Sequence, residues 1–313
     1  MTIKSNGFTN SSLRTRLRAC RSFLLTPGSR PEGFGAALEG DGIIVDLEAT
    51  VAPRDKLKAR EAALAFLRRP AEEGFPRILR INSPRSVEGL RDLLALHESA
   101  ARPDALLIPK CQSADEIRIV ADILDGSQSG IGIIPMVEVA RAVFVVDHMA
   151  QAHERVCGLF LGGGDMAADL GAEGAWENLL FARSQIVAAA ATTGIAAIDS
   201  PYFKGDSAGL EREATASRKL GMTSKATLHA EQLPAINTIY TPLSDAMTHA
   251  RAVIDAVATA EGGYPVLTGH VVEPAMVREA ERVLAIEEKL HNHAQGRLAK
   301  RSECDTIKDA LQS

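Results

Sequence analysis

Eight short apolar runs recur along the chain, separated by longer stretches with helical spacing. The runs are almost continuous Ile, Leu and Val, which is typical of strands buried on both faces. Eight such strands, each followed by a helix, predict an α/β fold in which a parallel sheet closes into a TIM (β/α)8 barrel with a C-terminal helical extension. A doubly wound open sheet is the alternative, but no clear break in strand order favours it. The predicted strands are Arg21–Thr26, Gly42–Leu47, Arg77–Ile81, Ala105–Pro109, Gly130–Val137, Arg155–Leu161, Ile195–Asp199 and Thr223–Ala226.

The stretches between the runs carry apolar residues three and four positions apart, as amphipathic helices do. Val87–His97 and Leu179–Ala191 are examples. Ser113 stands directly before two acids, which predicts a helix start there.

Three segments follow from this pattern. Residues 1–19 are predicted to be a flexible N-terminal tail, with an arginine-rich transit peptide as the alternative. Residues 20–262 are predicted to form the catalytic barrel, whose eighth helix would span about Leu243–Ala260. Residues 263–313 would be an extension containing a helix from about Ala275, which can cover the site or contact a neighbouring subunit.

The composition limits the possible partners. The 313 residues include 35 Lys and Arg against 40 Asp and Glu, a formal net charge of −5. That mildly acidic balance argues against nucleic acid or an anionic membrane as a partner. No apolar run approaches the roughly 18 residues of a transmembrane helix. The 4 cysteines form no CxxC pair and are interpreted as free thiols in a reducing cytoplasm.

Charged residues stand where several predicted strands end. Glu138 ends the run IGIIPMVE and Asp165 ends VCGLFLGGGD, while Arg80 and Lys110 end two earlier runs. The carboxyl ends of barrel strands meet at one face, where barrel enzymes place their active sites. Two carboxylates on successive strands suit Mg²⁺, which takes one or two carboxylates and keeps positions for water and substrate oxygens. We therefore expect Glu138 and Asp165 to be metal ligands, with Asp165 as a helix N-cap being the alternative.

Arg80 and the acids of the second strand offer two interpretations. A guanidinium at a strand end suits bidentate capture of a substrate carboxylate. Alternatively, Arg80 forms an ion pair at the barrel rim with Asp46 or Glu48. These two acids flank Leu47 and would point to the same face, supporting the metal's water shell or holding Arg80. Lys110 is expected to have a polar supporting role, because a Schiff-base lysine gains little from a nearby magnesium ion.

Phosphate-binding signals are weak. The turn Gly28-Ser29-Arg30 can hold phosphates, but the chain has neither GxxxxGK[ST] nor GxGxxG. Nucleotide chemistry of the P-loop or Rossmann type therefore has no support.

At these same residues the chain resembles the citrate lyase β-subunit-like group of the HpcH/HpaI aldolase superfamily. The resemblance runs from about Arg21 to Leu284. Together its segments are highly specific, although each alone is unremarkable. They are RSFLLTPGSRPEGF, IIVDLEATVAPRDKLKAR, LRINSP, LLIPK, IPMVEVARAV, LFLGGGDMAADLG, IAAIDSPYF, KATLHAEQLPAIN and VVEPAMVREAERVLA.

The resemblance implies a Mg²⁺-dependent barrel enzyme that acts on coenzyme A thioesters and assembles as a homo-oligomer, a trimer or hexamer. It implies metal ligation by Glu138 and Asp165 and carboxylate binding by Arg80, with Asp46 in the same catalytic site. Glu273, in VVEP, would reach into a neighbouring subunit. The implied coenzyme A contacts are Arg30, Lys56 and Arg60.

The expected reaction is retro-Claisen cleavage of a 3-hydroxyacyl-CoA into acetyl-CoA and a 2-oxo acid, with citramalyl-CoA preferred over malyl-CoA and citryl-CoA. The alternatives are a malyl-CoA thioesterase and a citrate lyase β subunit that depends on an acyl carrier. Three departures from the family pattern leave the substrate open. The family's DLED ends in Ala49 here, Glu273 replaces an expected aspartate, and a triple glycine, Gly162–Gly164, stands where GPxDL is usual.

Overall fold

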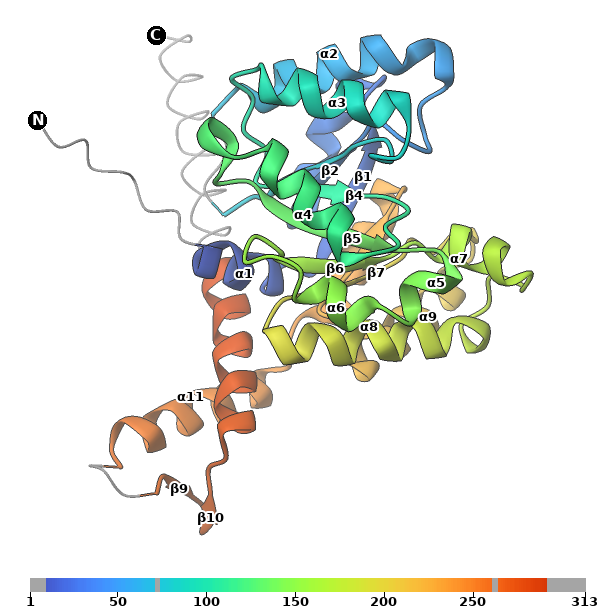
Figure 1. Cartoon of the computed structure of the whole chain (residues 1–313). Helices are drawn as coiled ribbons and strands as arrows, with labels where there is room; N and C mark the ends of the chain where they lie inside the picture. The colour runs from blue at the N-terminus through green and yellow to red at the C-terminus, as the bar shows by residue number, and fades with distance from the viewer. Residues whose placement is uncertain (1–9, 71–73, 261–263, 292–313) are drawn as a thin grey trace, which may run out of the picture. The chain divides into compact units, whose positions relative to one another are not determined.

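Strands β1 to β8 pair side by side in chain order, all parallel, and β8 pairs back with β1 (Figure 1). This computed structural model describes residues 10–70, 74–260 and 264–291. The closed order confirms the predicted TIM barrel and excludes the doubly wound sheet. The strands are β1 (Ser22–Pro27), β2 (Ile43–Asp46), β3 (Arg77–Arg80), β4 (Ala105–Ile108), β5 (Gly132–Val137), β6 (Gly158–Leu161), β7 (Ala196–Asp199) and β8 (Ser224–Thr227).

Among the described residues of the first of two compact units, residues 1–240, ten α-helices accompany the barrel. They are α1 (Asn10–Arg18), α2 (Lys56–Leu67), α3 (Val87–His97), α4 (Ala114–Ile123), α5 (Ala140–Val143), α6 (Val146–Ala150), α7 (Gly163–Leu170), α8 (Leu180–Thr193), α9 (Ser207–Leu220) and α10 (Leu233–Tyr240). Short 3-10 helices are η1 (Pro31–Glu39), η2 (Pro53–Asp55), η3 (Gly126–Gln128), η4 (Glu177–Leu179) and η5 (Ala230–Gln232).

Two strands begin two or three residues later than predicted. β5 starts at Gly132 and β6 at Gly158, because Arg155 is used in the connection before β6. Its buried guanidinium donates to the backbone carbonyls of Ala121, Gln128 and Ile131. The predicted helix start at Ser113 is confirmed, since the Ser113 hydroxyl accepts from the Glu116 amide.

The core has two layers that follow the alternation of the strands. Residues such as Ile44, Leu107 and Phe160 fill the interior of the barrel, whereas their neighbours on the same strands pack under the helices. Cys20, Cys111 and Cys157 are buried within these layers, and Cys304 lies outside the described residues.

The N-terminal segment differs from the prediction of a flexible tail over 1–19. Residues 10–18 form helix α1, and Leu13 and Leu17 are buried with the interior of the barrel. Arg14 donates to the carbonyl of Val156, and Arg16 forms an ion pair with Asp104, both next to the N-terminal ends of strands. Two leucines four residues apart share one helix face, so α1 covers the N-terminal end of the barrel.

The second compact unit, residues 241–313, begins earlier than the predicted boundary at 262. Helix α11 (Ser244–Ala258), predicted as the eighth barrel helix, belongs to this unit, and α10 follows β8 instead. Ala250 and Val253 of α11 pack with Ala280 and Val283 of the helix over 274–291, which explains the grouping. The unit also contains a hairpin of β9 (Val266–Leu267) and β10 (His270–Val271).

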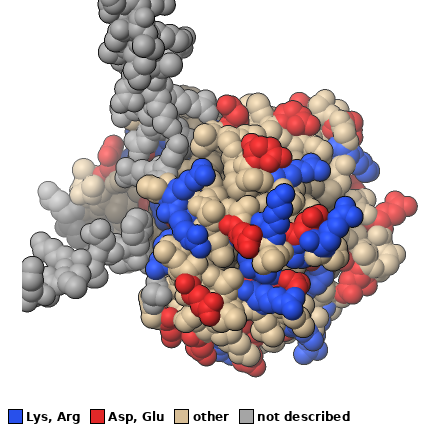
Figure 2. Space-filling view, turned by 90° about the horizontal axis from the view of Figure 1, so that it is seen from above, with Lys and Arg blue, Asp and Glu red and all other residues tan. Residues whose placement is uncertain are grey.

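No helix among the described residues is long and apolar enough to cross a membrane. The face drawn in Figure 2 carries cationic and acidic side chains interspersed, without an extended surface of one sign.

Candidate active site at the carboxyl ends of the strands

Asp46 and Arg80 face each other at the ends of β2 and β3. They are register partners in the sheet, and their side chains form a two-point ion pair, with Arg80 Nε 2.6 Å from Asp46 Oδ1 and Nη2 2.7 Å from Oδ2. Both side chains are buried. Arg80 and Asp46 therefore form an ion pair at the barrel rim, which is one of the two interpretations that the sequence allowed.

Asp46 has little capacity for further contacts. Besides Arg80, it accepts hydrogen bonds from the Glu48 and Thr50 amides and from the Thr50 hydroxyl, at 2.7, 2.9 and 2.5 Å. Burial alone would raise the pKa of Asp46, but the charge and hydrogen bonds of Arg80, with those of Thr50 and Glu48, hold it below its usual value. Asp46 therefore stays ionised and fixes Arg80, whose remaining nitrogen, Nη1, lies 3.7 Å from Glu48 Oε2.

Glu138 follows β5 and is almost fully buried, with 1% of its surface exposed. The backbone amide of Lys110 donates a 2.7 Å hydrogen bond to its Oε1. Gly162 makes room for the carboxylate, since a Cβ at that position would lie 2.2 Å from Oε2. Glu138, directly after β5, thus requires a glycine directly after β6.

The pKa of Glu138 is raised from 4.5 to about 7. Burial is the main cause, and the nearby charge of Asp165 adds to it, while the Lys110 charge and amide act in the opposite direction. Glu138 is thus buried beside a second carboxylate, and the positive charge around it is too small to hold its pKa at the ordinary value. A divalent cation would supply that charge.

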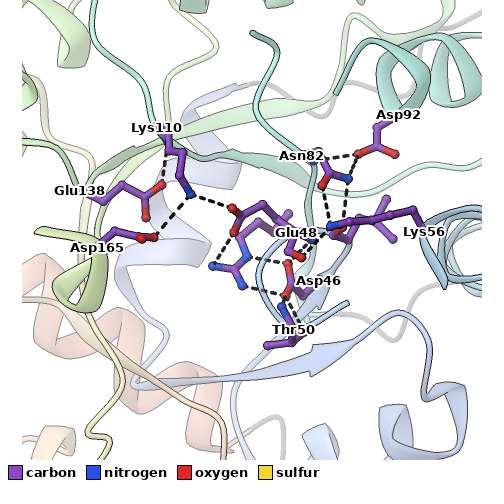
Figure 3. Close-up of polar contacts among 11 residues, drawn as sticks. Asp46, Glu48, Thr50, Lys56, Asn82, Asp92, Lys110, Glu138 and Asp165 are labelled. Atoms are coloured by element: carbon purple, nitrogen blue, oxygen red, sulfur yellow. Dashed lines mark hydrogen bonds and ion pairs between the residues drawn. The ribbon is translucent and has the colours of Figure 1, made fainter. Parts of the chain in front are cut away.

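Asp165 lies in the first turn of α7, and the N-cap is Gly162, so the N-cap interpretation of Asp165 is wrong. Its side chain is 48% exposed, and its Oδ2 lies 3.6 Å from Lys110 Nζ. The same ammonium lies 2.7 Å from Glu48 Oε1 (Figure 3). Lys110 therefore places a positive charge beside the carboxylates that follow β2, β5 and β6.

Lys110 also has an unusual backbone, with a φ of 56° in the left-handed region. A lysine in this region is uncommon, and outliers of this kind cluster at functional sites. This conformation accompanies both the amide contact with Glu138 and the ammonium contact with Glu48.

The site suits a metal bound by few protein ligands. Among the described residues there is no group of three or more His, Cys, Asp or Glu that could hold an ion. Glu138 and Asp165 form a pair instead, which is the number of carboxylates that Mg²⁺ takes when water and substrate complete its shell. The first amides of α7 have no intrahelical acceptor, and Gly162 offers no side-chain cap, so they can bind an anion.

Lys56 and Arg60, predicted to contact coenzyme A, have structural partners. Lys56 Nζ donates to the carbonyls of Leu47 and Glu48 and to Asn82 Oδ1, each at 2.7 Å, which uses all three of its donors. Arg60 is buried, with its guanidinium paired to two acids of α3, 2.6 Å from Asp92 and 2.7 Å from Glu88. Arg30 is exposed at the start of η1.

Asn82 and Asp92 complete the site through contacts that no sequence pattern predicts. Asp92 accepts from the Asn82 amide and side chain, and Asn82 in turn donates to Leu47 O. The network joins the end of β3 to α2 and α3 and holds the loop that carries Glu48 (Figure 3). The only sequence signal is Asn82 in LRINSP, since Asp92 looks like any polar residue of an amphipathic helix.

Glu273 lies in the second unit, exposed and directly before the helix over 274–291. Its backbone carbonyl accepts from the Met276 amide. Its predicted role in a neighbouring subunit stays a prediction.

Comparison with known proteins gives a consistent result. Residues 21–230 match the model of the HpcH/HpaI aldolase/citrate lyase family. The chain is 31% identical over 292 residues to the citrate lyase subunit beta of Escherichia coli K12, covering 88% of this chain and 96% of the relative. It is also 31% identical over 301 residues to the L-malyl-CoA/beta-methylmalyl-CoA lyase of Rhodobacter capsulatus, covering 86% and 94%.

Solved structures of similar proteins lead to the same family. The Mycobacterium tuberculosis CitE in complex with magnesium, acetoacetate and coenzyme A superposes with a TM-score of 0.67 at 30% identity, covering 87% of this chain and all of that one. RipC from Yersinia pestis gives a TM-score of 0.66 at 34% identity, covering 73% and 98%. The chain belongs to the HpcH/HpaI aldolase/citrate lyase family.

Proposed function

We propose that this protein is a Mg²⁺-dependent carbon–carbon lyase that cleaves a 3-hydroxyacyl-CoA thioester into acetyl-CoA and a 2-oxo acid. The observation that carries the proposal is the Glu138 and Asp165 pair beside Arg80 at the carboxyl ends of the strands. The relatives support the class, because they are a citrate lyase subunit and a malyl-CoA lyase, and CitE was solved with magnesium and coenzyme A.

In this proposal Glu138 and Asp165 hold the ion, which stabilises negative charge on substrate oxygens. Arg80, fixed by Asp46 on one side, uses Nη1 to bind the substrate carboxylate. The amides at the start of α7 are further donors for substrate oxygens. Lys110 orients Glu138 through its amide and offsets the negative charge of the acids.

Citramalyl-CoA is the first substrate to test, followed by malyl-CoA and citryl-CoA. The three differ only in the substituent on the hydroxyl-bearing carbon. The assay follows 2-oxo acid and acetyl-CoA separately in the presence of Mg²⁺. Equal formation of both products from one thioester supports the lyase and identifies its substrate.

Three results would contradict the proposal. Free acid with coenzyme A and no 2-oxo acid would indicate a thioesterase. Activity that appears only with added partner proteins would indicate an acyl-carrier-dependent subunit. Full turnover by Glu138→Gln would remove the metal pair from the mechanism, with the exposed Glu98→Gln as the matched control.

A separate part of the proposal is that neighbouring subunits share each active site. If the chain forms a homo-oligomer in which Glu273 completes a neighbour's site, Glu273→Gln and Arg80→Lys are each inactive alone. Mixed oligomers of the two variants would then contain some sites with both native residues and regain activity. An active Glu273→Gln protein, or no recovery in verified mixed oligomers, would show that Glu273 has no such role.

A further inference from the structure

A pocket of about 580 Å³ lies among the start of α7, η4, α8, α9 and the loop after β7. That volume is typical of sites for small organic molecules. Trp176, Tyr202 and Phe203 give it aromatic walls, and Gly163 and Gly164 form the wall toward α7. These two glycines follow Gly162, so the pocket shares the first turn of α7 with the candidate active site.

Arg183 lines this pocket and has an unusual set of contacts. Its side chain is only 2% exposed, and its Nε lies 2.9 Å from Asp199 Oδ1. Its Nη2 is 3.7 Å from Glu213, and its guanidinium carbon is 4.4 Å from the centre of the Trp176 ring. The remaining nitrogen, Nη1, is buried and has no hydrogen-bond partner among the described residues.

A buried charged donor without an acceptor is unfavourable, so structures rarely retain one. Among the described residues, Nη1 makes no hydrogen bond to either neighbouring acid: Asp199 Oδ1 contacts Arg183 Nε, and Lys225 Nζ lies 2.7 Å from Asp199 Oδ2 and 2.8 Å from Glu213 Oε1. The two acids are thus shared between two cations. Because Arg183 lines the pocket, a ligand bound there can supply an acceptor for Nη1.

The charges of the pocket wall favour an anion. Arg183, Lys204 and Arg212 line it, against Glu177 and Glu213. Since Lys225 and Arg183 already neutralise Asp199 and Glu213, the exposed Lys204 and Arg212 provide additional positive charge. An oxyanion could accept from Nη1 while its apolar or planar body rests on the aromatic walls.

We propose that this pocket is a binding site for a small organic oxyanion, a carboxylate or a phosphate ester with an apolar body, recognised by Arg183. The site adjoins the metal-binding end of the barrel through the first turn of α7, and ligand binding to it does not depend on the proposed lyase activity. Because Gly163 and Gly164 line the pocket, a bound ligand would lie against the turn that carries Asp165.

Trp176 is the only tryptophan of the chain and lies against Arg183, so its fluorescence reports on the pocket without an activity assay. The probes are cyclohexanecarboxylate, cyclohexyl phosphate and the neutral cyclohexylmethanol. We expect a saturable change with at least one anion, at an affinity about tenfold or more above that of the alcohol. The tighter anion identifies whether the ligand class is a carboxylate or a phosphate ester.

Variants test the assignment further. Arg183→Lys keeps a charge near Asp199 but removes Nη1, and it should weaken anion binding by about tenfold or more. Because that buried change can also impair folding, Ala216→Leu, which fills the pocket from α9, is the second variant and should abolish binding. Lys204→Ala and Arg212→Ala should weaken binding, whereas the exposed Lys58→Ala and Arg54→Ala should not.

The proposal is overturned if neither anion saturates the signal, or if the alcohol binds as tightly as both anions. Undiminished anion binding by folded Ala216→Leu would also overturn it, because the ligand would then lie elsewhere. Failure of the lyase assay would not affect any of these results.

Discussion

Glu138 lies so close to Gly162 that a single methyl group at the glycine would overlap its carboxylate, with the added Cβ 2.2 Å from Oε2. The residue that follows β5 therefore constrains the residue that follows β6. This relationship makes a sharp test of the metal pair possible, because the neighbouring glycines have different surroundings.

Gly162→Ala should displace Glu138 and weaken Mg²⁺ binding by about tenfold or more, the usual effect of disturbing a metal ligand's support. Gly164→Ala is the matched control, because its Cβ would meet nothing closer than Phe203 at 3.8 Å. Isothermal titration of both variants with Mg²⁺ measures the difference. Equal affinities for the two variants would contradict the assignment of Glu138 as a ligand.

Mg²⁺ affinity should depend on pH through Glu138. The ion binds the ionised carboxylate, and the pKa of Glu138 in the metal-free protein is about 7. Affinity should be nearly constant above pH 8 and fall about tenfold per pH unit well below pH 7. Titrations across this range check the slope. A midpoint near the ordinary value of 4.5 would show that burial and Asp165 do not perturb Glu138.

The same raised pKa affects stability without metal. The folded state binds the proton of Glu138 more tightly than the unfolded chain does, so the stabilisation is complete below about pH 4.5 and is lost as the pH rises through about 7. At pH 8 in a chelator, Glu138→Gln should therefore raise the free energy of unfolding, by an amount of the order of 3 kcal/mol. Urea denaturation measures the change, with Glu98→Gln as control. A less stable Glu138→Gln protein would reverse the predicted sign.

Arg80→Met should lower the free energy of unfolding by about 3–5 kcal/mol, because it leaves Asp46 charged and buried without its partner. The double variant Arg80→Met with Asp46→Asn should recover part of the loss. Denaturation of both single variants and the double variant gives the coupling energy. Additive losses would show that the two side chains do not stabilise each other.

Lys110→Met should increase Mg²⁺ affinity about fivefold at pH 8 and above, because a positive charge beside the acids is removed. Below pH 7 the gain should shrink, since the Lys110 charge helps to keep Glu138 ionised. The exposed Lys58→Met is the control. Weaker binding at high pH would mean that Lys110 organises the site more than it competes with the ion.

The sequence was sufficient for the barrel because buried parallel strands have a distinctive continuous apolar pattern. The strand pattern also predicted that Asp46, Arg80, Glu138 and Asp165 lie at one face of the barrel, because the carboxyl ends of the strands meet there. The sequence pattern did not predict that α1 covers the N-terminal end of the barrel. Leu13 and Leu17 form too short an apolar pattern to outweigh the polar and basic residues around them.

The finer parts of the site depend on tertiary contacts. The position of Lys110 Nζ follows from a left-handed backbone, which no side-chain pattern reveals. The family resemblance implied a coenzyme A contact for Lys56, but no sequence pattern showed that its donors contact Asn82 and two carbonyls. The role of Gly162 can be predicted only when the distance between this glycine and the Glu138 carboxylate is known.

Apart from the proposed Glu273 of a neighbouring subunit, the ion pairs and carboxylates of the candidate active site come from the span between Asp46 and Asp165, which builds β2 to the start of α7. The loops after β7 and β8 contribute none of them among the described residues. Selection for new substrates can therefore act on those loops while the catalytic framework is inherited unchanged. Sequence libraries confined to residues 201–206 and 228–232 would leave every one of those ion pairs and carboxylates in place.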